Sequence, residues 1–404
     1  MAPDIVYADL HVHLGASDDG SLVKVTAARS LTVANIAAEC VERKGIGMIG
    51  LVDAHSPRVI ADVRRLIAAG EAEEVRGGGI RYRDRLTLIL GSEVETGERD
   101  GCSAHQLAFF RDLTAISDFS RALSHHVSNI DLSTQRCRLD ATGLAGLVAS
   151  LGGLLIPAHV FTPHKGIYGS CTTSLSECFP PQALAAIPAL ELGLSADTEL
   201  AEQIPETARF AFVSNSDAHS LPKIGREYNA IRLNDATFDD LAAALWQRDG
   251  LAVVGNYGLD PRLGKYHRTF CDACGWQAAG EPPEMACPRC GGPVTRGVLD
   301  RIAEIALSAG ATGRRSPAAA PGASSRHAPY YHHVPLEYIP GVGPRAHARL
   351  LSAFGTEMAV LHRASESELA DVVGAKVAHS IILGRSGRLR LSPGGGGHYG
   401  RVID

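Results

Sequence analysis

Histidine and acidic residues recur in pairs separated by one residue along the first 220 positions of the chain. The pairs are His11 with His13, Asp53 with His55, and Asp217 with His219. In an extended strand, side chains two residues apart point to the same face, so each pair presents two polar groups together. Imidazoles and carboxylates are ligands of divalent metals. The pairs therefore predict one shared polynuclear metal centre.

Single residues between these pairs extend the predicted ligand set. Glu93 is the best candidate for a carboxylate that bridges two ions, and His105 and His159 add two imidazoles. Two or more divalent ions can acidify water and neutralise charge during phosphoester hydrolysis. We expect two to three ions of zinc, manganese, magnesium or iron, with catalytic roles for Asp217, Glu93, His11 and His13. The predicted metal ligands are His11, His13, Asp53, His55, Glu93, His105, His159, Asp217 and His219.

Some assignments within this set stay open. Asp53, His55 or both could reach a metal, and Asp19 is a weaker candidate for an early ligand. Asp9 shares a strand face with His11, so we expect its carboxylate to orient the His11 imidazole. A lone histidine is more often an ordinary core or surface residue, but the pairing of so many candidates favours ligation.

The elements that position these residues follow from the apolar pattern. Strand-like runs alternate with helical patterns up to about residue 260, which predicts a parallel sheet. The expected helix from Leu31 to Lys44 is amphipathic and is followed by Gly45. In β/α barrels the functional residues lie at the carboxyl ends of strands, where the predicted ligands other than His105 fall. The expected strands are Ile5–Leu10, Met48–Val52, Leu86–Leu90, Gln106–Phe110, Leu154–Ala158, Ala189–Leu194 and Arg209–Ser214.

The motif set resembles the polymerase-and-histidinol-phosphatase (PHP) superfamily. Within it, the runs from Gly152 to Gly169 and from Ser214 to Ser220 resemble the endonuclease Q family of DNA-repair enzymes. The resemblance implies a distorted (β/α)7 PHP barrel with clustered metals, followed by a four-cysteine zinc ribbon and a C-terminal helical domain. It also implies cleavage 5′ to deaminated bases (uracil, hypoxanthine, xanthine) or abasic sites. One departure is Ala54, which separates Asp53 from His55 where related members have adjacent Asp and His.

Two Cys-x-x-Cys pairs, Cys271 with Cys274 and Cys287 with Cys290, are separated by twelve residues. Four thiolates complete a tetrahedron and leave no position for water, so this spacing predicts one structural zinc ion. Whether the ribbon braces the barrel or contacts DNA through Arg268, Arg289 or Arg296 stays open. We expect the other five cysteines only to pack, because nine cysteines in this pattern fit a reducing compartment better than a disulfide framework.

Two further segments have residue types that suit DNA. The turn Gly341-Val342-Gly343-Pro344-Arg345 resembles a helix-hairpin-helix element, whose backbone N–H groups face a phosphate, and a weaker copy starts near Val373. We therefore expect Gly341, Gly343 and Arg345 to bind DNA. Lys165 and Tyr168 follow His159 on one loop and are predicted to hold a flipped nucleotide, with simple loop packing as the alternative.

Charge and composition divide the chain. Residues 1–261 carry 22 Lys+Arg and 33 Asp+Glu, whereas residues 262–404 carry 17 and 11, so the C-terminal part suits an anionic polymer. The predicted domains are a catalytic barrel (1–261), the zinc ribbon with a following helix (262–308), a flexible linker rich in Ala, Pro, Gly and Ser (309–328) and a helical DNA-binding domain (329–404).

The N-terminus lacks the basic and apolar regions of a signal peptide, and we expect a cytoplasmic protein without a membrane span. The expected partner is DNA that contains deaminated or abasic nucleotides. Whether a sliding clamp or another repair protein also binds is left open by the sequence. Two other functions would also use parts of this sequence: a small-molecule phosphoesterase of the histidinol-phosphatase type, and a noncatalytic DNA-binding scaffold. The DNA-binding segments argue against the first, and the complete ligand set argues against the second.

Overall fold

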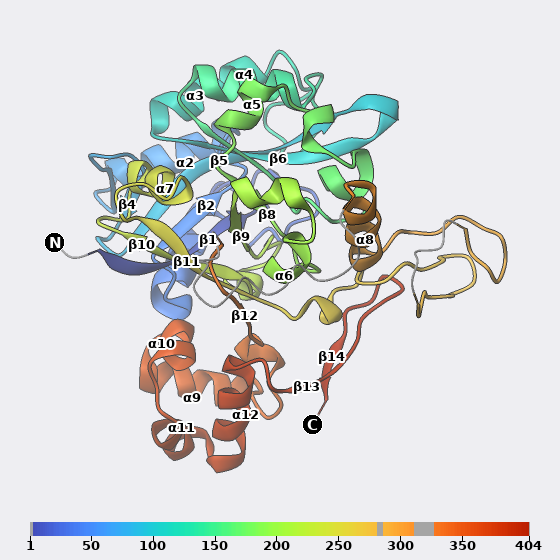
Figure 1. Cartoon of the computed structure of the whole chain (residues 1–404). Coiled ribbons are helices and arrows are strands. Elements are labelled where there is room, and N and C mark those ends of the chain that lie inside the picture. Colours follow the sequence, from blue (N-terminus) through green and yellow to red (C-terminus); the bar gives the residue numbers. More distant parts are fainter. Residues whose placement is uncertain (1–2, 281–285, 311–326, 404) are drawn as a thin grey trace.

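A mixed ten-stranded sheet forms the body of the molecule in the computed structural model, which describes residues 3–280, 286–310 and 327–403 (Figure 1). Its strand order is β12-β11-β10-β1-β2-β5-β4-β3, with β6 paired to β5 and β7 paired to β6. A separate parallel pair is formed by β8 (Ala189–Glu191) and β9 (Ala211–Val213). The ten strands are β1 (Asp4–Val12), β2 (Met48–Leu51), β3 (Ala72–Glu74), β4 (Ile80–Tyr82), β5 (Leu86–Gly97), β6 (Ser103–Phe110), β7 (Leu154–Pro157), β10 (Tyr228–Leu233), β11 (Ala252–Gly258) and β12 (Tyr330–His332).

All seven predicted strands occur, as β1, β2, β5, β6, β7, β8 and β9. The expectation of a parallel sheet is right only in part. Strands β1, β2 and β5 are parallel, but β6 runs antiparallel to both β5 and β7, and β10 runs antiparallel to β1. The short turn at Arg99–Gly101 explains the β5–β6 pairing, because a parallel connection needs a crossover of a dozen or more residues.

The sheet curves around an apolar interior, with β8 beside β7 and β9 beside β11. Leu10, Ile89, Phe109 and Ile156 belong to this interior, and a second apolar layer lies between the sheet and its helices. The expected helix before β2 occurs as α1 and a following π-helical segment, Cys40–Lys44, and Gly45 ends it with a φ of 79°. The surrounding helices are α1 (Val33–Glu39), α2 (Pro57–Ala68), α3 (Leu113–Leu123), α4 (Ala141–Ser150), α5 (Pro181–Ala186), α6 (Thr198–Ala201) and α7 (Phe238–Leu245).

The C-terminal third of the chain lies to the right of this body and below it in Figure 1. Strand β12 falls in the range predicted for the helical domain, yet it pairs with β11 before the helices begin. Residues 311–326, which make up most of the predicted linker, lie outside the described residues. An unpredicted hairpin of β13 (Arg390–Ser392) and β14 (Arg401–Ile403) follows the helices. The helices are α8 (Val298–Ser308), α9 (Pro344–Phe354), α10 (Glu357–His362), α11 (Glu366–Val373) and α12 (Ala375–Arg385). In the described part of the chain, every helix is too short or too polar to cross a bilayer.

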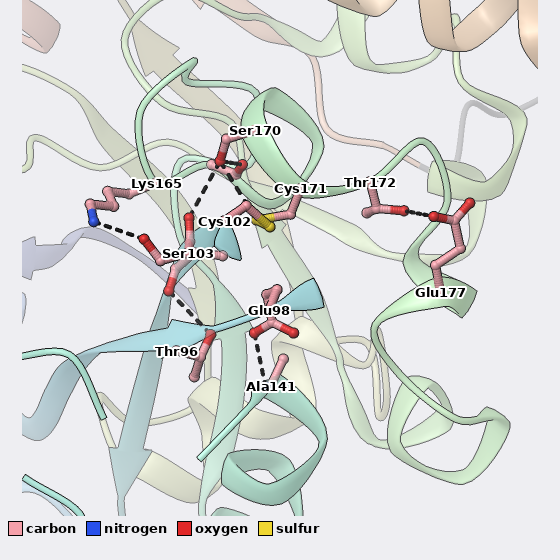
Figure 2. The surroundings of a disulfide bond; sticks show 12 residues. Thr96, Glu98, Cys102, Ser103, Ala141, Lys165, Ser170, Cys171, Thr172 and Glu177 are labelled. Carbon is pink, nitrogen blue, oxygen red and sulfur yellow. Dashed lines mark hydrogen bonds between the residues drawn. A yellow bond between two sulfur atoms is a disulfide. The ribbon is translucent and has the colours of Figure 1, made fainter. Parts of the chain in front are cut away.

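Cys102 and Cys171 form a disulfide between the start of β6 and the turn Ile167–Cys171 (Figure 2). The expectation that these two cysteines only pack is therefore wrong. They lie 69 residues apart in the sequence but their Cα atoms are 5.5 Å apart, so their proximity depends on tertiary structure and not on spacing. Around the bond, Ser103 accepts hydrogen bonds from Ser170 and, at its hydroxyl, from Lys165 (Figure 2).

Candidate metal centre and DNA-binding elements

Most of the predicted ligands meet in one cavity of about 540 Å³ at the carboxyl ends of the central strands. Their ligand atoms form three groups, each within 4.8 Å. His13 and Glu93 each belong to two groups, so they would join neighbouring ions. The three groups are His11 with His13 and Glu93, His13 with Asp217 and His219, and Glu93 with His105 and His159.

The imidazoles of His11 and His13 are fixed from behind by carboxylates. His11 Nδ1 lies 3.0 Å from Glu191 Oε1, and His13 Nδ1 lies 3.0 Å from Asp53 Oδ2. A carboxylate at Nδ1 holds the proton there and leaves a lone pair on Nε2. The two Nε2 atoms face each other at 3.3 Å. Two lone pairs at this separation repel unless a cation lies near both, so the donor set fits divalent metal ions.

Two of the predicted ligands, His159 and Asp217, have left-handed backbone conformations, with φ values of 28° and 46°. Such conformations are unfavourable for residues other than glycine and persist only where neighbouring contacts impose them. His159 N donates to Glu191 Oε2 (2.8 Å), and the backbone of Ala218 exchanges hydrogen bonds with His11 and His13. These contacts aim both side chains into the cavity.

Glu191 at the end of β8 was missed by sequence reasoning, and the available signal was a single acid inside the apolar run that was predicted as a strand from Ala189 to Leu194. Burial alone would raise its pKa, but the His11 imidazole outweighs this effect and lowers the pKa below its ordinary value.

Asp9 does not contact the His11 imidazole as expected. Its carboxylate instead accepts hydrogen bonds from the backbone N–H groups of Ser216 (3.0 Å) and Gly225 (2.9 Å), because these lie closer across the strand end.

Asp53, His55 and Asp19 lie outside the three ligand groups found among the described residues. Asp53 faces His13 and also accepts a hydrogen bond from Leu14 N (2.7 Å). His55 Nδ1 lies 2.8 Å from Ser92 Oγ, and burial lowers its pKa to about 4. Asp19 is exposed and bonded to Ser17 and Ser21. Metal ligation by these three stays a prediction, and the contacts favour a supporting role for Asp53.

The predicted nucleotide-holding role of Tyr168 is wrong. Its side chain is fully buried, its hydroxyl donates to Glu206 Oε1 (2.7 Å), and its ring stacks on the buried ring of Phe161 at 5.5 Å. The apolar Ile167–Tyr168 pair therefore turns into the core, which is the loop-packing alternative. Lys165 does line the cavity, and Tyr266 and Tyr399 are the tyrosines that line it.

Comparison with known proteins decides the family. Two family models match, one described as PHP-associated over residues 197–249 and one described as a SAM-like helix-hairpin-helix tandem over residues 335–385. The chain is 45% identical over 401 residues to the uncharacterized protein YqxK of Bacillus subtilis, which covers 98% of this chain and 99% of that protein.

Two solved structures match almost the whole chain. The lesion-specific endonuclease PfuEndoQ from Pyrococcus furiosus has 30% identity and a TM-score of 0.81, over 99% of this chain and 95% of that one. A complex of endonuclease Q with a 27-mer duplex that has an abasic lesion at the active site gives the same identity and TM-score, over 99% and 97%. The chain belongs to the endonuclease Q family. This result confirms the resemblance stated above and makes the chain a member of a family of DNA-cleaving hydrolases.

The four cysteines predicted to form the zinc ribbon of this endonuclease Q family member come together. Their sulfur atoms lie within 4.8 Å of one another, with Cys271 Sγ 3.6 Å from Cys290 Sγ and Cys274 Sγ 3.5 Å from Cys287 Sγ. Of the three arginines considered for DNA contact, two pair with α8 instead: Arg268 with Asp300 (3.1 Å) and Arg296 with Glu304 (2.9 Å). Arg289 is exposed. The contacts favour a bracing role for the ribbon.

The C-terminal helices have the predicted turn geometry. Gly341 has a φ of 86°, Gly343 directly precedes α9, and Gly374, with a φ of 85°, directly precedes α12. A side chain at Gly341 would place its Cβ 2.8 Å from Val377 of α12, so glycine is needed where the two copies approach. Arg345 is exposed in the first turn of α9. Its side chain is therefore free to meet a phosphate beside the helix N-terminus.

Proposed function

We propose that this protein is a metal-dependent endonuclease that cuts the phosphodiester bond 5′ to a lesion in DNA. The observation that carries the proposal is the pair of carboxylate-fixed imidazoles, His11 and His13, within the ligand cluster of the cavity. The abasic duplex bound by the related endonuclease Q supports an abasic site as one substrate. The family resemblance extends the proposal to uracil, hypoxanthine and xanthine.

The residues present fit two to three divalent ions of zinc, manganese, magnesium or iron in the cavity, and one structural zinc ion at the four cysteines. The cavity ions would be held by His11, His13, Glu93, His105, His159, Asp217 and His219. Bound there, they would supply acidified water and positive charge against the phosphate oxygens. Glu191 and Asp53 orient the imidazoles, and Gly341, Gly343 and Arg345 would bind the duplex backbone away from the cut.

The charge of Glu93 is set by its neighbours. Burial would raise its pKa, but His105 and Lys24 together lower the pKa well below its ordinary value. Lys24 Nζ lies 3.2 Å from Glu93 Oε2 and also donates to Thr134 Oγ1 (2.5 Å). Glu93 therefore stays ionised at neutral pH and can serve two ions. Nothing in the local sequence had indicated that Lys24 would pair with Glu93.

The direct test is cleavage of end-labelled duplexes that contain an abasic site, uracil, hypoxanthine or no lesion, with added Mg²⁺ or Mn²⁺. We expect one cut 5′ to the lesion by the unaltered protein and loss of that cut in Asp217→Asn. Arg248→Met, a surface change remote from the cavity, is the matched control and should cut normally. Intact duplexes together with hydrolysis of a phosphate monoester would replace the proposal with a small-molecule phosphoesterase.

A further inference from the structure

Three lysines among the described residues line the cavity, and their charges are balanced differently. Lys24 pairs with Glu93 (3.2 Å), and Lys165 pairs with Glu95 (2.6 Å). No carboxylate in residues 3–280, 286–310 or 327–403 lies within ion-pair distance of Lys265. Lys265 therefore brings an uncompensated positive charge to the cavity that holds the metal ligands.

Two tyrosine rings lie near the ammonium group of Lys265. Lys265 Nζ lies 4.8 Å from the centre of the Tyr266 ring and 5.8 Å from that of Tyr399. The Tyr266 ring in turn meets the His164 ring edge-on at 5.2 Å. Such rings attract a cation without neutralising its charge. The arrangement restrains Lys265 in the lining of the cavity and keeps its charge available to an anion.

The turn between β13 and β14 is hydrogen-bonded to the backbone of residues 262–265, the segment that carries Lys265. Gly394 N donates to Arg262 O (2.7 Å), Gly400 N to Leu263 O (2.9 Å), and Gly397 N to Lys265 O (3.3 Å). A Cβ at Gly394 would lie 2.8 Å from Gly264 O, so the close approach requires glycine there. In Figure 1 the hairpin runs back from the helices toward the segment that follows β11. The extreme C-terminal part of the chain thus builds one wall of the cavity and contributes Tyr399 to it.

We propose that Lys265 binds a backbone phosphate of the DNA strand that enters the cavity, and that Tyr399 and the β13–β14 turn position it. The proposal rests on the proposed function and adds a contact outside the barrel to it. A phosphodiester fits because its single negative charge complements the Lys265 ammonium group. Lys265 also lines the same 540 Å³ cavity as most of the predicted metal ligands. Tyr399 acts through Lys265 and is therefore a positioning residue.

The test compares Lys265→Met, which keeps the length of the side chain, with Lys265→Arg and with Arg248→Met. Arg248 is a matched control because it is exposed, lies 5.4 Å from the Trp246 ring centre and does not line the cavity. Dissociation constants for an abasic duplex are measured by fluorescence anisotropy between 50 and 200 mM KCl, roughly the range over which phosphate contacts weaken. We expect Lys265→Met to weaken binding about 10-fold. The salt slope, which is the slope of the logarithm of the dissociation constant against the logarithm of the KCl concentration, should fall by about one. Lys265→Arg should restore the slope, and Arg248→Met should leave it unchanged.

Tyr399 is tested in a double-mutant cycle. Tyr399→Ala should weaken binding in the unaltered background but add nothing in the Lys265→Met background, because the two residues act as one unit. Tyr399→Phe keeps the ring and should bind normally. Equal binding and salt slopes for Lys265→Met and Arg248→Met would overturn the proposal even if the protein cuts lesions. If the protein cuts no duplex, the proposed function fails, while the binding slope still decides the Lys265 contact.

Discussion

Glu191→Gln is the sharpest test of how the metal centre is built. The Glu191 carboxylate makes contacts on both oxygens: Oε1 with His11 Nδ1 (3.0 Å) and Asn215 Nδ2 (2.7 Å), and Oε2 with His11 Nδ1 (3.1 Å) and His159 N (2.8 Å). All of these partners are donors when His11 carries its proton on Nδ1. Glutamine has the same size but replaces one acceptor oxygen with an NH₂ group, so at least one donor loses its acceptor.

The loss of this acceptor oxygen weakens metal binding through its effect on His11. Without the carboxylate, His11 can carry its proton on either nitrogen, and the Nε2 lone pair is present for only part of the time. Removal of such a supporting carboxylate typically lowers metal affinity 10- to 100-fold, which is about 1.4 to 2.7 kcal/mol. The side chain of Glu191 is almost fully buried, so solvent does not screen the effect.

The assay strips the protein of metal and titrates Mn²⁺ while cleavage of an abasic duplex is followed. We expect the Mn²⁺ concentration for half-maximal rate to rise about 10- to 100-fold in Glu191→Gln, with the rate largely recovered at saturating metal. Glu227→Gln is the control for a change at a buried acid, because Glu227 accepts a hydrogen bond from Leu259 N (2.9 Å) and belongs to none of the three ligand groups found among the described residues. An unchanged midpoint in Glu191→Gln, or the same rise in both variants, would refute the role of Glu191.

Three further predictions follow from other sites. Burial raises the pKa of Glu227 to about 8 from an unfolded value of 4.5, so its contribution to stability is complete below pH 4.5 and is lost as pH rises toward 8. Glu227→Gln should remove that loss, on the order of a few kcal/mol, and thermal unfolding at pH 5 and pH 8 checks it. Cys287→Ser should lower the bound zinc by one ion per chain in elemental analysis; unchanged zinc would contradict the four-cysteine site. Arg345→Ala should weaken binding to intact and abasic duplexes equally, with a salt slope lower by about one, and a loss confined to the abasic duplex would argue against it.

The metal site could be predicted where local geometry was enough. His11 and His13 meet because strand alternation is a local rule. Asp217 and His219 also meet, but they lie beyond β9 and Asp217 has a left-handed backbone, so alternation does not explain their placement. Glu191 was missed because its role depends on the placement of β8 next to the end of β1, which no local pattern encodes. The antiparallel direction of β6 was missed because apolar runs mark strands but not their direction.

Tyr168 shows a second limit of sequence reasoning. An aromatic residue near a predicted ligand was assumed to face the substrate, but the loop turns so that the ring lies in the core and Arg301 Nε donates to its backbone oxygen (2.8 Å). Tyr399 lies 240 residues from His159 and showed no motif, yet it lines the cavity. Residues distant in sequence enter the site through packing, and only the folded chain reveals them.

Direct contacts fix the C-terminal helices to the body of the molecule. Lys44 Nζ at the end of the α1 segment donates to Glu357 Oε1 of α10 (2.9 Å), and Tyr228 OH of β10 lies 2.7 Å from His362 Nε2. Burial lowers the pKa of His362 to about 4, so its ring is neutral and can accept this hydrogen bond. The His362 ring also stacks on Tyr7 of β1, the strand that leads to His11 and His13.

These contacts have a consequence for cleavage. A duplex bound by the turns before α9 and α12 would lie at a set distance from the metal ligands, because His362 of α10 stacks on Tyr7 of β1, the strand that leads to His11 and His13. A flexible linker alone would allow cuts at many distances from the bound DNA backbone. A rigid connection between the helices and the strands selects one distance. If the proposed cut on the 5′ side of a lesion is made, its position would then come from the packing of α10 on β1 and β10 as much as from the metal centre itself.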